Sequence, residues 1–100
     1  MVSDDLRFDL ATRFWSADHS SLCFDCSIGK RLIRFYLPRS CYPALCNHSS
    51  PGIPDCLRIF DENSLLLIDA AQQVFERNNG YSNAYVITTE AIETAGSILG

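Results

Sequence analysis

Five cysteines and two histidines are the residues of this 100-residue chain whose chemistry could support a metal site or a reactive thiol. Cys23 and Cys26 lie three residues apart before a glycine-containing turn, which is the outline of a zinc knuckle. The remaining ligands of such a site would be Cys41, Cys46 and His48. The alternative is that the first pair lies in one strand, where residues three apart point to opposite faces and cannot bind one ion. We favour the strand and expect no bound metal and no cofactor.

Thiol chemistry is the second possibility that these residues raise. Cys41 would lie in the first turn of a short helix beside Arg39, where a thiolate is favoured. We favour the alternative, in which Cys41 is a small, partly buried apolar residue. A dyad of His19 or His48 with Cys41 or Cys46 stays open, although solvated loop histidines are the commoner case. An odd cysteine count fits a disulfide framework badly, so we expect all five as thiols and predict no catalytic residue.

Composition limits the class of protein and its partners. With 47% hydrophobic and 20% charged residues, the chain is typical of one globular domain over residues 1–100. The net charge of −4 argues against nucleic acid as a partner. No apolar run approaches the ~20 residues that span a bilayer, so we expect no membrane partner. The acidic N-terminus has no apolar segment typical of a secretory signal, and we predict a cytoplasmic protein.

Residues 21–37 predict a β-hairpin around Gly29-Lys30, with a type II′ turn. One register places apolar side chains opposite each other on one face of this hairpin and an opposite-charge pair on the other face. It pairs Leu22 with Leu37, Phe24 with Phe35, and Cys26 with Ile33 on one face, and Asp25 with Arg34 and Cys23 with Tyr36 on the other. A slip of one residue would destroy both agreements at once.

Residues 55–78 predict one long helix, which the rest of the chain has to support. Its apolar residues recur at three- and four-residue spacing; they are Leu57, Phe60, Ser64, Ile68, Ala71 and Phe75. Asp55 is the expected N-cap, and Asn78-Asn79-Gly80 the stop. In a less favoured alternative, residues 56–60 are extended and the helix begins near Asp61.

A second apolar strip, made of Ile59, Leu66 and Ala70, lies on the opposite side of this helix. If the strip is exposed, it is a candidate interaction site, because exposed apolar strips mark such sites. Alternatively, the strip is buried beneath the C-terminal helix. The sequence leaves both open.

The remaining elements complete an α+β fold. We expect a strand at residues 6–10, with Phe14 and Trp15 as a lid on the core, a short helix at 40–46 capped by Ser40, and a strand at 84–88. Thr89 should cap a last helix, whose buried side would be Ala91, Ile92, Ala95 and Ile98. The predicted fold has two layers: a small, mainly antiparallel sheet of N-terminal strand, hairpin and C-terminal strand, packed against one long helix, with two short helices.

This order of elements resembles the small bacterial family known as domain of unknown function 1488. The residues that carry the resemblance are Phe8, Trp15, Phe24, Gly29, Leu45, Phe60, Ile68, Ala71, Val86, Ile87 and Thr88. It covers residues 6–92, and the cysteine- and proline-rich middle departs from the family's pattern. The resemblance implies a compact α+β domain and no particular activity.

Two functions therefore remain. The first, which we favour, is a non-enzymatic interaction or regulatory module that binds a protein partner, including a second copy through the long helix. The second is a small zinc-binding or thiol-redox protein that uses Cys23, Cys26, Cys41 and Cys46.

Overall fold

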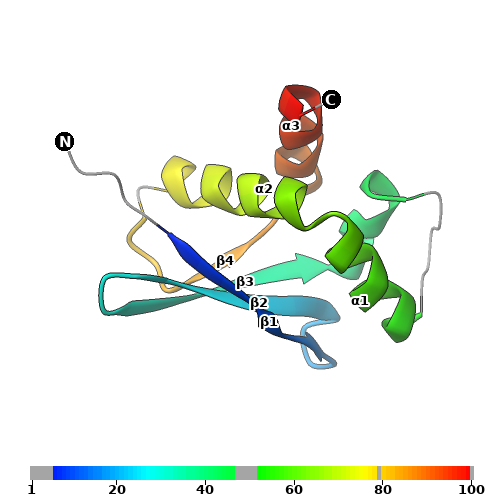
Figure 1. Ribbon diagram of the computed structural model, residues 1–100, viewed down its shortest axis with the longest axis horizontal. Coiled ribbons are helices and arrows are strands. Elements are labelled where there is room, and N and C mark those ends of the chain that lie inside the picture. The colour runs from blue at the N-terminus through cyan, green and yellow to red at the C-terminus, as the bar shows by residue number, and fades with distance from the viewer. Residues whose placement is uncertain (1–5, 47–51, 79, 100) are drawn as a thin grey trace.

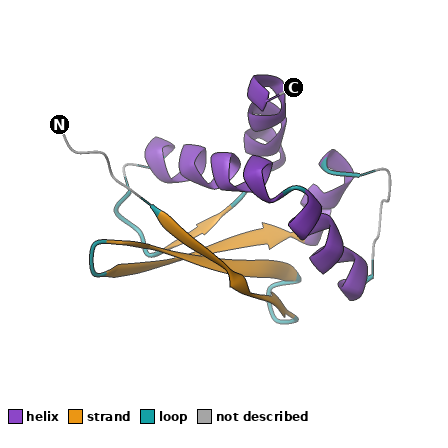
Figure 2. Cartoon of the chain, viewed as in Figure 1, coloured by secondary structure: helices purple, strands orange, loops and turns teal. Residues whose placement is uncertain are grey.

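A computed structural model describes residues 6–46, 52–78 and 80–99. The strands are β1 (Arg7–Ser16), β2 (Ser21–Ile28), β3 (Arg31–Pro38) and β4 (Ala84–Val86). The helices are η1 (Arg39–Ala44), α1 (Ile53–Glu62), α2 (Ser64–Arg77) and α3 (Thr89–Leu99). The sheet order is β1-β2-β3-β4, antiparallel except for the parallel pair β3–β4. The labelled helices lie on one side of this sheet (Figures 1 and 2), so the α+β class and the mainly antiparallel sheet are confirmed.

The hairpin has the predicted register at every position. Phe24 pairs with Phe35, and Asp25 with Arg34, as the two-face pattern requires. Gly29 has φ of +59°, the left-handed region that the first position of a type II′ turn demands. The side chains of Phe24 and Phe35 are buried and stack with ring centroids 5.6 Å apart. Burial of one face therefore fixes the register, because a slip of one residue would move the buried apolar side chains to the other face.

Strand β1 extends further than the sequence predicted. Its register with β2 shifts between Asp9 and Phe14, and within this bulge Thr12 Oγ1 donates to the Asp9 carbonyl at 3.0 Å. Beyond the bulge the strand resumes, so that Phe14 and Trp15 alternate between the two faces. The prediction of a joint lid was wrong, because only Trp15 packs against the core.

The predicted long helix is two helices, α1 and α2, with a break at Asn63. Asn63 has φ of −116° and ψ of 24°, and its side-chain Nδ2 donates to the Ile59 carbonyl at 2.8 Å. Its backbone N–H bonds the same carbonyl, and its own carbonyl accepts from Leu67 N–H to begin α2. Asparagine competes for helical carbonyls in this way, which the apolar periodicity does not reveal. The prediction of one continuous helix was wrong for this reason.

Of the two predicted ends of the long helix, the start was wrong and the stop is confirmed. Helix α1 begins at Ile53 after Gly52, so Asp55 lies in the first turn and is not the N-cap. At the end of α2, Asn78 Nδ2 donates to the Val74 carbonyl and Gly80 N–H to the Phe75 carbonyl, which confirms the predicted stop.

The shorter elements also differ from prediction by small amounts. The 3₁₀ helix η1 follows Pro38 and has no side-chain cap, so the assignment of Ser40 was wrong. Thr88 Oγ1 accepts a hydrogen bond from Ala91 N–H at 3.1 Å, which places the capping hydroxyl one residue before Thr89. The buried side of α3 contains Ala91, Ile92 and Ala95; the side chain of Ile98 lies outside the described ones.

Candidate functional site

The sheet face opposite the helices presents an apolar row that crosses all four strands. Phe14, Cys23, Tyr36 and Val86 are successive cross-strand partners on this face. Val86 is 54% exposed and Phe14 40%, and Leu32 on the same face is 63% exposed. None of the helices in the described ranges lies over this face (Figure 1). We call it the open face, defined by Phe14, Cys23, Leu32, Tyr36 and Val86.

Charged side chains lie beside the apolar row. Asp25 accepts two hydrogen bonds from Arg34, at 2.8 Å from Nε and 3.1 Å from Nη2. The hydrogen bond to Asp25 raises the pKa of Arg34 further above its usual range. The guanidinium also lies over the Phe14 ring, 4.9 Å from its centroid. The predicted cross-strand ion pair is thus present, and it fixes Arg34 flat against the open face.

A shallow cavity of about 250 Å³ opens at one end of this face. Its lining residues are Arg7, Asp9, Thr12, Asp25, Cys26, Ser27 and Leu32. The volume is below the ~300–1,000 Å³ of typical small-molecule sites. The cavity therefore suits one side chain of a partner better than a cofactor.

The predicted strand geometry of the first cysteine pair is confirmed. Cys23 pairs with Tyr36 on the open face, whereas Cys26 pairs with Ile33 on the core face. Burial raises the pKa of the Cys23 thiol, although the Arg34 cation opposes the rise. Burial raises the pKa of Cys26 to about 11, with the Asp25 carboxylate adding to the effect. Because the two side chains point to opposite faces, they cannot ligate one metal ion together, and the raised pKa values lower the fraction of reactive thiolate at neutral pH.

The other sequence candidates are dispersed. Cys41 is buried, with its Sγ 3.4 Å from the Ile87 carbonyl and 3.7 Å from the Thr89 hydroxyl. Cys46 is half-buried and donates to the Tyr42 carbonyl at 3.5 Å. His48 lies outside the described residues. Among residues 6–46, 52–78 and 80–99, no three acidic, cysteine or histidine side chains are arranged to hold a metal ion.

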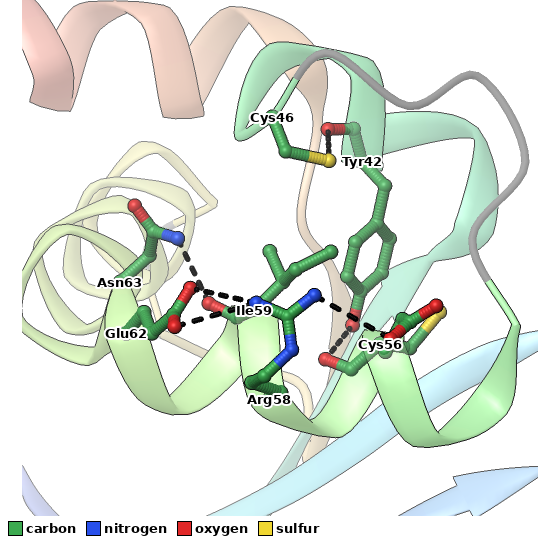
Figure 3. Close-up of polar contacts among 8 residues, drawn as sticks. Tyr42, Cys46, Cys56, Arg58, Ile59, Glu62 and Asn63 are labelled. Carbon is green, nitrogen blue, oxygen red and sulfur yellow. Dashed lines mark hydrogen bonds and ion pairs between the residues drawn. The ribbon is translucent and has the colours of Figure 1, made fainter.

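Tyr42 is a buried polar residue that the sequence did not single out. Its hydroxyl donates to the Cys56 carbonyl at 3.0 Å, which ties η1 to the first turns of α1 (Figure 3). Burial is the main reason that the pKa of Tyr42 is raised well above its usual range. On the outer side of α1, Arg58 bridges Asp55 and Glu62 in solvent-exposed pairs, which contribute little to stability. The buried Tyr42 hydrogen bond therefore holds η1 against α1 and has a structural role.

The strip of Ile59, Leu66 and Ala70 is not the exposed surface that one alternative required. Ile59 is 3% exposed and Ala70 is fully buried, while Leu66 is half-buried against the core. A Cβ added at Gly96 of α3 would lie 3.8 Å from Leu66 Cδ1, so α3 approaches this side of α2. All three residues are therefore buried or half-buried in the monomer, and for Leu66 the approaching element is the C-terminal helix, as the burial alternative expected.

The residues that the sequence missed are the exposed apolar ones of the open face. Leu32 and Val86 occupy alternate strand positions whose inward neighbours, Ile33 and Tyr85, are buried. Their apolar type at outward positions was the available signal. Their exposure depends on which face the helices leave uncovered, which the sequence does not state.

Helices on one face of a mainly antiparallel four-stranded sheet define a small two-layer α+β domain. Its fold is similar to the crystal structure of a protein of unknown function from the DUF1488 family of Shewanella loihica PV-4, with a TM-score of 0.75. The match covers 87% of this chain and 96% of that chain at 12% sequence identity. The resemblance to domain of unknown function 1488 is thus confirmed at the level of the fold.

The other comparisons give no match: no family model matches this sequence, and none of the curated proteins does. In the described part of the chain, no helix has the length and apolar character needed to cross a membrane.

Proposed function

We propose that this chain is a non-enzymatic interaction domain that binds a protein partner through the open face. The observation that carries the proposal is the exposure of Phe14, Leu32 and Val86 on one side of a sheet whose other side holds the core. Several exposed apolar side chains on one face of a sheet mark a candidate interaction site, whereas single ones scattered over the surface do not. Phe14 and Val86 are the exposed ends of a cross-strand row whose middle members are covered, since Cys23 is fully buried and the His19 ring lies 4.7 Å from the Tyr36 ring.

The face is better suited to docking than the sheet edges. Edge strands can pair with another chain, but β1 is interrupted by its bulge and β4 has three residues. These features limit strand addition at both edges. The open face has no such interruption across β2 and β3, whose register is regular from Ser21 to Pro38.

The energy available from the apolar row is moderate. The exposed fractions of Phe14, Leu32 and Val86 amount to about one and a half side chains, worth ~2–5 kcal/mol when buried. Association costs at least as much, so polar groups at the rim must contribute. Arg34 and Asp25 are already fixed by their mutual hydrogen bonds, which lowers the entropy lost when a partner contacts them.

Affinity capture from an extract of the source cells tests this proposal. The double variant Leu32→Ser, Val86→Ser should lose the proteins that the wild-type chain retains, because both side chains are more than half exposed and their loss leaves the core intact. The matched control is Ile53→Ser, Leu65→Ser, which removes two exposed apolar residues from α1 and α2. Circular dichroism should show both variants folded. Equal losses with the two variants, or none with either, would contradict the proposal.

A further inference from the structure

We infer that the partner of the open face is a second copy of this chain, docked sheet against sheet around a two-fold axis. The inference rests on the proposed function and specifies the occupant of the same surface. Two copies would form four layers, with helices outside and two sheets inside. Sheets packed face to face lie about 10 Å apart, with side chains of the two inner faces interdigitated.

The distribution of charge favours a second copy. The outward-facing charges of the strands on the open face are Arg7, Asp9, Asp25 and Arg34, which sum to zero. Helices α1, α2 and α3 carry seven acidic and two basic residues, and the whole chain has a net charge of −4. Two copies that met through their helices would bring these acidic surfaces together. Docking through the open faces brings together neutral surfaces and leaves the acidic helices on the outside of the pair.

The same distribution disfavours other partners at this surface. A neutral face does not attract a strongly charged partner, whether basic or acidic. A two-fold arrangement, however, lets each face offer cations and anions to the same set on its partner. The Arg34–Asp25 ion pair, together with Arg7 and Asp9 on β1, gives each face both signs of charge.

The area of the open face sets the affinity expected for the dimer. Strands of 10, 8, 8 and 3 residues, at ~3.3 Å per residue and about 4.8 Å apart, cover roughly 460 Å². Two such faces bury on the order of 1,000 Å², the low end of specific interfaces. We therefore expect a weak, concentration-dependent dimer, with a dissociation constant on the order of 10–100 µM.

Sedimentation equilibrium of the purified chain, from about 5 µM to 1 mM, tests the inference. The wild type should pass from monomer to dimer across this range. Leu32→Ser and Val86→Ser should each raise the dissociation constant by about tenfold or more, because each removes an apolar side chain from the interface. Leu65→Ser, which removes a 77% exposed leucine from α2, should leave it unchanged.

An isotope-filtered NOE spectrum locates the interface independently. A dimer of labelled and unlabelled chains should show intermolecular contacts from the methyl groups of Leu32 and Val86. Contacts from Leu65 instead, or a dimer that Leu65→Ser weakens as much as Val86→Ser does, would overturn the inference.

The two proposals can fail separately. A wild-type chain that stays monomeric at 1 mM refutes the second copy. If the Leu32→Ser, Val86→Ser variant still loses captured proteins in that case, the interaction function stands with a different partner. If it captures the same proteins as the wild type, both proposals are refuted.

Discussion

The protonation of Cys26 gives a quantitative test of whether the cysteines belong to the fold or to a reactive site. Its side chain is 1% exposed on the core face of β2, and burial together with Asp25 raises its pKa from 9 to about 11. A thiol whose pKa is higher in the folded state than in the unfolded state favours folding while it stays protonated. Its contribution is complete below pH 9 and is lost as the pH rises toward 11.

The size of this loss follows from the shift of about two pKa units. One unit corresponds to ~1.4 kcal/mol, so the full loss is ~2.7 kcal/mol above pH 11. At pH 10 the unfolded thiol is mostly ionised and the folded one is not, which corresponds to about half of that value, ~1.4 kcal/mol. Cys26→Ala lacks this titration, although its cavity lowers stability equally at every pH.

Urea unfolding of both proteins at pH 7 and pH 10, with a reductant present, measures the difference. Other groups titrate in both proteins and cancel in the comparison. The free energy of unfolding of wild type should fall by ~1.4 kcal/mol more than that of Cys26→Ala between the two pH values. Equal falls would refute the argument that burial holds Cys26 as a thiol. They would also reopen the thiol function that the strand geometry disfavours.

Two further predictions concern residues that fix the backbone. Gly29 and Gly80 both have positive φ, but an added Cβ meets nothing within 4 Å at Gly29 and lies 2.7 Å from Phe75 Cζ at Gly80. Gly29→Ala should therefore cost about 1 kcal/mol and Gly80→Ala about 1–3 kcal/mol more by urea unfolding; equal costs would contradict the clash. Tyr42→Phe should lower the free energy of unfolding by about 0.5–1.5 kcal/mol, since the hydroxyl bonds the Cys56 carbonyl, and an unchanged value would show that this bond contributes nothing.

The parts of the fold that could be predicted from sequence are those that two independent patterns determine together. The hairpin register satisfied an apolar face and an Asp25–Arg34 pair at once, and it is correct at every position. The stop after α2 rested on asparagine and glycine together, and Gly80 has the positive φ that glycine permits. Agreement between patterns excludes the alternatives that each pattern alone would allow.

The parts that failed depended on one pattern alone. Apolar periodicity from Leu57 to Phe75 is continuous across Asn63, because a short break in a helix changes its direction without removing its buried side. The side-chain bond from Asn63 to the Ile59 carbonyl ends α1, and periodicity contains no information about it. The sequence left the exposure of Ile59 and Leu66 open for a related reason, since the break and the approach of α3 decide which side of each helix is covered.

For the candidate site, the direction of each side chain could be predicted from sequence, but its exposure could not. Strand periodicity fixes that Leu32 and Val86 point away from Ile33 and Tyr85, because neighbouring side chains in a strand alternate between faces. Whether that outward direction meets solvent or a second layer depends on where the helices pack. The acidic residues of α1, α2 and α3 lie on elements that cover the other face, and the open face keeps balanced charge. An apolar row within a neutral surface, on a chain that is otherwise acidic, is what makes a second copy the partner that fits this face.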